Sequence, residues 1–327
     1  MSLPELNILF SAAGRRVSLL RHFRRTLDAL AVRGEILAAD AGRSAPAARV
    51  ADRAIQVPRV SAPDYIDRML AVCAEHRVGM LFPLIDTDLL LLAQNRERFA
   101  AVGTRVVVSS EASVALSFDK RLTEAFFRAH GIDTPAVLDE QALDTHADFP
   151  VLIKPWDGSC GVGVTRIRNA EELHFFRRYI PHAMVQELVS GEEFTCDVLA
   201  GLDGRVRCVV PRKRLEIRGG EVSKGLTVKD PAIMAAAQRV VECLPGAVGC
   251  ITVQCFRQGD GRLRFIEINP RFGGGFPLAL HAGADFPRWL IQEHLGLPVG
   301  SAMADWQDDL AMLRYDDEIL VAGSEIR

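Results

Sequence analysis

Short apolar runs alternate with amphipathic stretches over the first 115 residues of the chain. The runs have the length and aliphatic composition of buried strands, whereas the stretches between them repeat apolar positions every three or four residues, as helices do. Predicted strands fall within 7–16 and at 35–40, 78–84 and 104–110, and predicted helices at 17–30, 63–76 and 86–99. Elements that alternate at this spacing predict a parallel sheet with helices on both faces.

The pattern changes after about residue 115, where hairpins replace this alternation. Predicted helices lie at 117–135, 169–179, 231–244 and 276–295, and predicted strands at 149–155, 183–189 and 193–201, with a hairpin over 249–269. A glycine-rich turn at 157–164 leads into a further strand, and a Ser-Gly turn separates the strands at 183–189 and 193–201. We therefore predict two domains, an α/β domain over 1–115 and an α+β domain over 116–327.

The composition is that of an ordinary globular protein and narrows the function classes. The 327 residues are 49% hydrophobic and 25% charged, and the formal net charge is −3. This balance does not indicate nucleic-acid binding, which usually requires a basic surface, and no stretch is typical of a signal peptide or a membrane span. The seven cysteines include no CxxC spacing, so we expect buried thiols in a protein of the reducing cytoplasm.

A lysine and a glycine-rich turn follow one another between two predicted strands. Lys154 ends the apolar run VLIK, and a buried lysine needs an anionic partner. In the turn DGSCGVGV, the residues Gly158, Gly161 and Gly163 let backbone N–H groups approach phosphate oxygens, because no Cβ is in the way. Together they indicate a nucleoside triphosphate site, although the turn by itself is equally compatible with a flexible hairpin.

The stretch FIEINPRFGGG at 265–275 contains a carboxylate, an amide and a guanidinium, followed by three consecutive glycines. Glu267 and Asn269 are two residues apart on a predicted strand, so their side chains leave the same face. Gln254 lies on the preceding strand of the hairpin, and antiparallel pairing can bring it beside them. Oxygen donors without histidine or cysteine favour Mg²⁺ over Zn²⁺. A solvated strand end is the alternative, and it does not explain the apolar flanks.

Other polar segments are open to two interpretations each. VQELVSGEEF at 185–194 is either a connector that offers backbone groups to an adenine and a carboxylate to a ribose, or a plain hairpin. The basic segment 210–225, with Arg214, is either a set of substrate contacts or a solvated hairpin face. Residues 14–16 and 86–88 follow predicted strands, where open α/β sheets bind ligands, and they are equally suited to starting a helix.

Taken in order, six segments resemble the motifs of the ATP-grasp superfamily, in particular of its carbamoyl-phosphate-synthetase-like members. They are DK at 119–120, VLIKP at 151–155, DGSCGVGV at 157–164, VQELVSGEEF at 185–194, VQ at 253–254 and IEINPRFGGG at 266–275. The match covers about residues 116–300, and the N-terminal sheet looks like the pre-ATP-grasp domain that precedes it. The resemblance implies a two-lobed ATP-grasp domain whose small lid lobe spans about residues 125–188.

The resemblance also implies a nucleotide-binding set. Its members are Lys120, Lys154, Gly158, Ser159, Gly161, Gly163, Gln186, Glu187, Val189 and Glu193. The two lysines and the glycine-rich loop would contact the ATP phosphates. Gln186 and the backbone of Glu187 and Val189 would hold the adenine, and Glu193 the ribose. One departure is that position 186 is Gln, where many relatives have Glu; a Gln can still accept from the adenine amino group.

The metal and catalytic residues follow from the same resemblance. The implied metal ligands are Gln254, Glu267 and Asn269, which would hold two Mg²⁺ ions across the phosphates, with Mn²⁺ as an alternative metal. The implied catalytic residues are Arg271, Arg214 and Lys154, which would neutralise charge on the transferred phosphoryl group.

By this resemblance the chain is an ATP-grasp ligase that forms a carbon–nitrogen bond. ATP would phosphorylate a carboxylate, and an amine would attack the acyl phosphate, with release of ADP and phosphate. The alternatives are a carbamoyl-phosphate-synthetase-like subunit that makes carboxy-phosphate or carbamoyl phosphate with a partner, and a non-catalytic nucleotide-binding module. An NAD dehydrogenase is disfavoured, because SAAGRR lacks GxGxxG. The expected partners are a small-molecule carboxylate and amine, and a homodimer is a further expectation.

Overall fold

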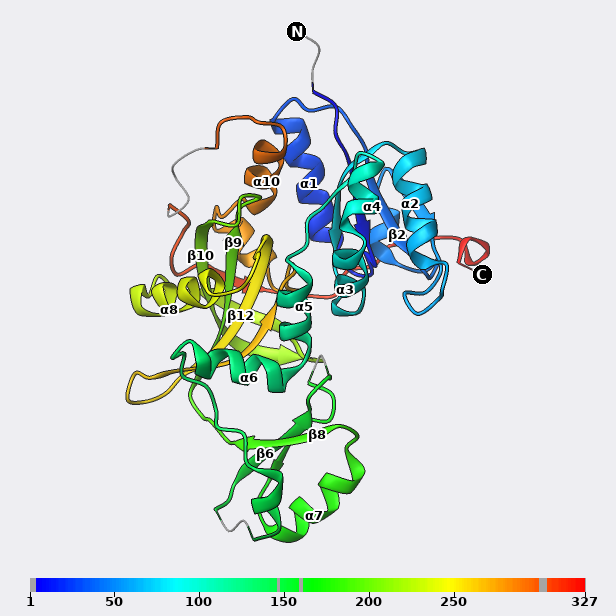
Figure 1. Ribbon diagram of the computed structural model, residues 1–327. Coiled ribbons are helices and arrows are strands. Elements are labelled where there is room, and N and C mark those ends of the chain that lie inside the picture. Colours follow the sequence, from blue (N-terminus) through cyan, green and yellow to red (C-terminus); the bar gives the residue numbers. More distant parts are fainter. Residues whose placement is uncertain (1–3, 146–147, 159–160, 300–304, 327) are drawn as a thin grey trace.

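The chain forms an N-terminal parallel sheet, a large antiparallel sheet and a smaller three-stranded lobe (Figure 1). The computed structural model describes residues 4–145, 148–158, 161–299 and 305–326. The expected fold class, a parallel-sheet domain followed by a two-lobed domain, is confirmed. Its domain limits at about residue 115 and at about 125–188 for the lid lobe stay predictions.

The N-terminal sheet has the strand order β3-β2-β1-β4-β5, and all of its strands are parallel. Its strands are β1 (Asn7–Ser11), β2 (Ile36–Asp40), β3 (Arg53–Gln56), β4 (Val78–Pro83) and β5 (Arg105–Val106). The edge strand β3 was not predicted, because its residues are mostly exposed and show no apolar pattern. The predicted strand at 104–110 shrinks to two residues.

Helices accompany this sheet much as the alternation predicts. They are α1 (Val17–Ala29), α2 (Tyr65–Glu75), α3 (Asp86–Gln94) and α4 (Arg96–Ala101), with a 3₁₀ turn η1 (Pro46–Arg49). The single helix predicted at 86–99 is therefore wrong, because it breaks at Asn95. The Asn95 side chain donates to the carbonyl of Leu91 at 2.8 Å and competes with the helical ladder.

The large sheet has the order β13-β12-β9-β10-β11-β14, with antiparallel neighbours throughout. Its strands are β9 (Glu192–Ala200), β10 (Val206–Arg218), β11 (Glu221–Thr227), β12 (Gly249–Arg257), β13 (Leu263–Asn269) and β14 (Ala311–Leu313). Its helices are α5 (Glu111–Phe118), α6 (Lys120–Ala129), α8 (Pro231–Glu242), α9 (Pro277–His281) and α10 (Phe286–His294). A last 3₁₀ turn, η3 (Gly323–Glu325), lies near the C-terminus.

Two predicted helices of this half are wrong in extent. The helix expected at 117–135 occupies only α6, since Asp119 caps it and separates it from α5. The helix expected at 276–295 is divided into α9 and α10, because Gly283 adopts a φ of 107° between them. A positive φ is accessible to glycine and incompatible with a continuous α-helix.

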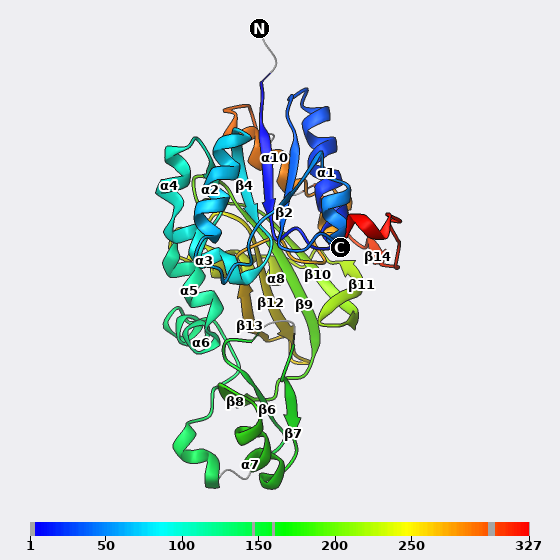
Figure 2. The ribbon, with the colours of Figure 1, turned by 90° about the vertical axis from the view of Figure 1, so that its right-hand side faces the viewer.

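The small lobe is a separate sheet with the order β7-β6-β8. It contains η2 (Glu140–Thr145), β6 (Val151–Pro155), β7 (Thr165–Ile167), α7 (Ala170–Tyr179) and β8 (Ala183–Glu187). Because β8 belongs to this sheet and β9 to the large one, residues 188–191 connect two lobes. The plain hairpin considered for this segment is therefore excluded. Figure 2 shows the small lobe at the end of the molecule opposite the N-terminal sheet.

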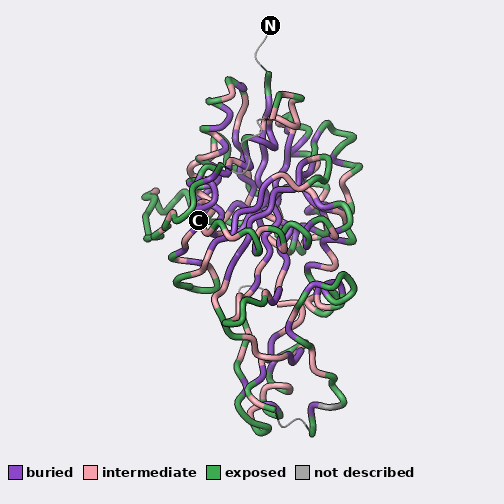
Figure 3. Tube along the Cα trace, turned by 90° about the vertical axis from the view of Figure 1, so that its left-hand side faces the viewer, coloured by how far each residue is buried: buried purple, intermediate pink, exposed green. Residues whose placement is uncertain are grey.

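The hydrophobic core joins the N-terminal sheet to the large lobe. Phe10 and Phe82 from the N-terminal sheet stack with ring centroids 5.6 Å apart, and Phe82 lies 6.1 Å from Phe272, which follows β13. Each buried ring contributes about 1.5–3 kcal/mol to folding. The buried chain is concentrated in this central region (Figure 3), whereas the small lobe has its own apolar cluster. The small lobe thus has an apolar core of its own.

The described cysteines are free thiols, and five of the six are buried. This agrees with the expectation of buried thiols. In the part of the chain that the structure covers, no helix is both long and apolar enough to cross a membrane.

Candidate active site

The hairpin β12–β13 aligns the three predicted metal ligands. Gln254 lies directly opposite Glu267, and Thr252 lies opposite Asn269, so the three polar side chains share one face of the hairpin. Gln254 and Glu267 are half-buried, and Asn269 is buried. Their donors are two amide oxygens and one carboxylate, with no nitrogen or sulfur ligand in the set. This donor set fits Mg²⁺, which keeps oxygen ligands and takes several of them from phosphates and water.

Two lysines of the neighbouring segments approach this face. Lys154, on β6, is only 7% exposed. Burial lowers its pKa to about 8, the charge of Glu267 raises it, and the charge of Lys120 lowers it. Lys120 begins α6, and its ammonium donates to the carbonyl of Gly158 in the glycine-rich loop. Lys154, on the small lobe, therefore interacts electrostatically with both Lys120 and the Glu267 carboxylate of the large sheet.

The glycine-rich loop connects the antiparallel strands β6 and β7. Gly161 and Gly163 have φ values of 72° and 75°, which other residues rarely adopt. A Cβ on Gly158 or Gly163 would lie 3.1 or 3.0 Å from the ring of Pro155. Ser159, also predicted to bind the nucleotide, lies outside the described residues.

The residues predicted to hold the adenine lie on β8 and on the connector that follows it. Gln186 is buried. The Glu187 carboxylate is 2.7 Å from the Arg264 guanidinium, and the Glu187 N–H donates to the carbonyl of Ala136 at 2.9 Å. The main-chain N–H of Glu187 is thus already bonded within the chain. Val189 is half-buried on the connector between the sheets.

Arg214 of β10 contacts both the predicted ribose ligand, Glu193, and one of the predicted metal ligands, Gln254. Its guanidinium lies 3.2 Å from the Glu193 carboxylate and donates to the Gln254 side-chain oxygen at 3.3 Å. Burial raises the pKa of Glu193, the Arg214 charge lowers it, and the Glu267 charge raises it. Arg214 is thus a half-buried cation within the same cluster.

Three other basic residues of the 210–225 segment form ion pairs nearer the surface. Lys213 pairs with Glu192, Arg218 with Asp316 and Lys224 with Glu216. For these three the interpretation as a solvated hairpin face applies.

Arg271, predicted to neutralise the transferred phosphoryl group, is paired with an acidic residue of the N-terminal domain. It donates two hydrogen bonds of 2.7 Å to Asp86 at the start of α3 and a longer one of 3.4 Å to the Asn269 side-chain oxygen. Asp88, the other acid of the 86–88 segment, is fully buried, and it accepts from Ser11 at 2.6 Å. Asp86 therefore orients Arg271, whereas Asp88 is structural.

The sequence analysis missed a buried ion pair beneath the glycines 273–275. Arg212 is 1% exposed and donates to Asp197 at 2.6 and 3.0 Å. A Cβ on Gly275 would lie 2.4 Å from the Arg212 guanidinium, so this glycine is needed for close packing. The available signal was the two-residue spacing of Arg212 and Arg214, which places both on one face of β10.

Two family models match the chain in separate parts. The model described as "PylC-like, N-terminal domain" matches residues 8–107. The model described as "ATP-grasp in the biosynthetic pathway with Ter operon" matches residues 179–317.

Curated relatives match part of the chain. The vancomycin/teicoplanin A-type resistance protein VanA of Enterococcus faecium is 26% identical over 211 residues, which are 57% of this chain and 60% of that protein. The D-alanine–D-alanine ligase of Gloeobacter violaceus is 33% identical over 113 residues, which are 31% of this chain and 37% of that protein. The chain thus spans less than two thirds of the length of these relatives.

Solved structures share the fold at low sequence identity. Biotin carboxylase from Campylobacter jejuni superposes with a TM-score of 0.74 at 16% identity, covering 93% of this chain and 74% of that one. L-amino acid ligase from Bacillus licheniformis superposes with a TM-score of 0.69 at 16% identity, covering 90% and 75%. At this identity the likeness concerns the fold.

Proposed function

Because the chain belongs to the ATP-grasp superfamily, we propose that it is an ATP- and Mg²⁺-dependent ligase that joins a carboxylate to an amine. The reaction passes through an acyl phosphate and releases ADP and phosphate. The observation that supports it best is the register of β12 and β13, which aligns Gln254, Glu267 and Asn269 on one face. Lys154 reaches the same space from the small lobe.

In this proposal the chain's residues neutralise and position phosphate groups. Lys154 and Lys120 bind the phosphates of ATP, and the glycine-rich loop covers them. Gln186 and the connector hold the adenine, while Glu193 holds the ribose. Phosphoryl transfer needs little covalent participation by the protein, so positioning and charge are the main contributions.

Gln254, Glu267 and Asn269 would hold Mg²⁺, which when bound supplies positive charge between the phosphates. The donor chemistry of the three residues supports Mg²⁺, and their number is compatible with a site completed by phosphate oxygens. Two ions, and activity with Mn²⁺, are parts of the proposal.

Arg271 and Arg214 contribute further positive charge to the transfer. Arg271 lies at the end of the metal-ligand strand, and Asp86 fixes its guanidinium plane. Arg214 is held beside Gln254 and Glu193. An arginine held in this way can neutralise the transferred phosphoryl group without first having to be ordered.

The test is release of ADP from Mg·ATP in the presence of pooled carboxylates and amines, with bicarbonate as a separate arm. Release that requires both a carboxylate and an amine supports the ligase. Bicarbonate-dependent release favours the carboxy-phosphate alternative instead. Nucleotide binding without ADP release in any arm would favour the non-catalytic module.

Variants assign the proposed roles within the same assay. Lys154→Met and Glu267→Gln should each lower turnover by roughly 10²–10³-fold, on the scale of losing one electrostatic donor. Glu242→Gln, on the exposed side of α8, is the matched control and should leave turnover unchanged. Full turnover in either site variant would refute the assignment.

The homodimer and the cytoplasmic location remain predictions. Measurement of the molecular mass in solution would check the first, and cell fractionation the second.

A further inference from the structure

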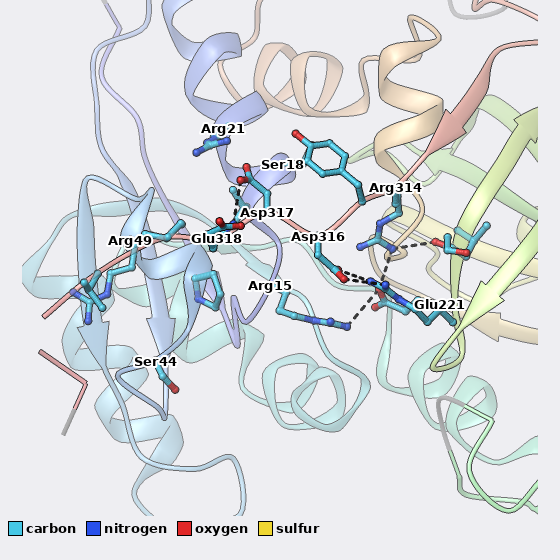
Figure 4. A pocket seen from close by; sticks show the side chains of 18 of the residues that line it. Arg15, Ser18, Arg21, Ser44, Arg49, Glu221, Arg314, Asp316, Asp317 and Glu318 are labelled. Carbon is cyan, nitrogen blue, oxygen red and sulfur yellow. Dashed lines mark hydrogen bonds and ion pairs between the residues drawn. The ribbon is translucent and has the colours of Figure 1, made fainter. Parts of the chain in front are cut away.

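Two cavities adjoin between the N-terminal domain and the large lobe. The inner cavity, of about 440 Å³, is lined by residues that include Gly14, Arg16, Ile85, Gly273 and Gly274. The outer cavity, of about 760 Å³, extends along α1 and the C-terminal segment. Figure 4 shows the outer cavity. The two share Arg15, Ser18, Glu221, His281, Arg314 and Tyr315 in their walls. The two cavities are therefore neighbours along this shared wall.

The inner cavity borders the residues that the proposed reaction uses. Ile85 immediately precedes Asp86, and Gly273 lies two residues after Arg271. Arg271 and Asp86 also contribute to the electrostatic surroundings of Arg16. A molecule in the inner cavity is thus next to the end of β13, where the phosphates would be held. Its volume is within the range of small-ligand sites.

The wall of the inner cavity carries more positive than negative charge. Its wall contains three arginines, Arg15, Arg16 and Arg314, and one carboxylate, Glu221. Glu221 lies 3.1 Å from Arg314, and 3.7 and 3.9 Å from Arg16 and Arg15. Figure 4 shows Arg15 and Arg314 directed at this carboxylate. Two further carboxylates act on these arginines, Asp316 and Asp86. Each of them is itself paired with another arginine, Asp316 with Arg218 and Asp86 with Arg271, so the excess of positive charge remains.

Arg16 is the member of this group best placed to bind a ligand. Its side chain is 20% exposed, against 78% for Arg15. Within the described part of the chain, it makes no hydrogen bond to a carboxylate, since its separation from Glu221 is too long. Burial, which carries a desolvation cost for a cation, lowers the pKa of the Arg16 guanidinium, and the Glu221 charge raises it. An anionic ligand would relieve this cost.

Gly274 explains how Arg16 reaches its position. A Cβ on this residue would lie 2.7 Å from the Arg16 guanidinium and 2.7 Å from the Glu221 carboxyl group. The bare backbone therefore makes room for these charged side chains. Apolar side chains complete the wall, among them Leu84, Ile85 and Phe276. The cavity thus presents a cation at one point and apolar surface around it.

Resting on the proposed function, we propose that the carboxylate substrate is a dicarboxylic acid. One carboxylate lies beside Arg271 and is phosphorylated, while Arg16 binds the other. In the reaction the first carboxylate attacks the γ-phosphorus, the bond from that phosphorus to the bridging oxygen breaks, and ADP leaves with the electron pair. The second carboxylate keeps its charge throughout and serves as the anchor.

Hydroxylamine makes the test independent of the natural amine, because it attacks acyl phosphates to give a hydroxamate and phosphate. The full chain is incubated with Mg·ATP, hydroxylamine and matched pairs of acids: L-glutamate with L-norvaline, and succinate with butyrate. We expect kcat/KM for the dicarboxylates to exceed that for their partners by about 10- to 100-fold, as one charged hydrogen-bonding contact provides. Equal rates for both members of each pair would overturn the proposal.

Substitutions of Arg16, the residue that precedes α1, test whether it is the anchor. Arg16→Gln should remove the preference for dicarboxylates, through a higher KM for them, and leave the rates with monocarboxylates unchanged. Arg16→Lys, which keeps the charge, should restore part of the preference. Arg68→Gln is the matched control, because Arg68 is exposed on α2, lines neither cavity and has no acid partner among the described residues. An unchanged preference in Arg16→Gln would refute the role of Arg16.

A binding experiment separates the failure of this inference from failure of the proposed function. If no acid gives ADP or hydroxamate, the ligase proposal fails, and calorimetric titration with glutarate then judges the cavity by itself. Glutarate binding to the wild type that is lost in Arg16→Gln supports the anion site. A wild-type chain that does not bind glutarate overturns it.

Discussion

Arg271 and Asp86 form a two-pronged ion pair, with both hydrogen bonds at 2.7 Å, although 185 residues separate them in the chain. Asp86 begins a helix of the N-terminal domain, and Arg271 follows the strand that bears Glu267 and Asn269. The pair connects the two domains beside the candidate active site. The position of the guanidinium is therefore set by a residue of the N-terminal domain.

Removing the Asp86 charge should lower activity without unfolding the protein. In Asp86→Asn we expect kcat to fall by about 10- to 100-fold, because the guanidinium loses the bidentate geometry that orients it. Steady-state ADP release measures this. Asp67→Asn is the control, since Asp67 pairs with Arg98 at 2.7 Å on the exposed surface. Equal activity in the two variants would contradict the orienting role.

Nucleotide affinity should depend on the protonation of Lys154. Burial lowers its pKa to about 8 in the ligand-free chain. Phosphate binding favours the ammonium form, so above about pH 8 binding must take up a proton, and the Kd for Mg·ATP should increase by up to about tenfold per pH unit. Titrations between pH 7 and 9.5 measure this slope.

Two substitutions at position 154 provide the controls. Lys154→Met should bind Mg·ATP weakly and with no such slope, while Lys154→Arg should lack the slope because arginine remains charged throughout. A slope that persists in both variants would assign the titration to another group.

The buried Asp88 carboxyl group should contribute less to the free energy of unfolding at neutral pH than at pH 4. Burial raises its pKa from 3.8 to about 6, and the Ser11 and Tyr65 hydroxyl groups lower it. The folded chain then binds more protons than the unfolded chain between about pH 4 and pH 6, so this contribution to stability is present below that window and is lost as the pH rises through it. Asp88→Asn removes this charging cost. Its free energy of unfolding should exceed that of the wild type by up to about 3 kcal/mol at pH 7.

Urea unfolding at pH 4 and pH 7 measures the difference for Asp88. The two proteins should be closest in stability at pH 4 and diverge toward pH 7. Asp67→Asn, at an exposed position, should show no comparable divergence. A variant less stable than the wild type at pH 7 would show that the charged form is favoured by the fold.

Gly275 should not tolerate a methyl group. In Gly275→Ala the new Cβ would lie 2.4 Å from both the Arg212 guanidinium and the Val222 side chain, and Arg212 is anchored by Asp197. We expect a loss of about 1–3 kcal/mol in the free energy of unfolding from overpacking. Gly259→Ala is the control, because a Cβ there would meet nothing within 4 Å. Equal stability of the two variants would show that Arg212 can move aside.

The sequence by itself determined the parts of the fold and site that depend on local periodicity. The alternation of strands and helices predicted the N-terminal parallel sheet. The β12–β13 hairpin predicted that Gln254 meets Glu267, because a short turn leaves little freedom in register and strand side chains alternate with a period of two. The order of the six motifs along the chain indicated the superfamily.

Edge strands and helix breaks were harder to predict from the sequence. The strand β3 is mostly exposed, and β14 is only three residues long, so backbone pairing rather than apolar periodicity defines them. The break at Asn95 depends on one side-chain hydrogen bond that a helical pattern does not reveal.

Only the tertiary structure decided which charged residues meet. Asp86 and Arg271, Arg16 and Glu221, and Asp197 and Arg212 are pairs that no spacing along the chain predicts. The reason is physical: hydrophobic burial, which sequence patterns report, has no direction, whereas an ion pair requires two backbone segments to be placed within a few ångströms of each other. That placement is fixed by the packing of the N-terminal sheet against the large lobe.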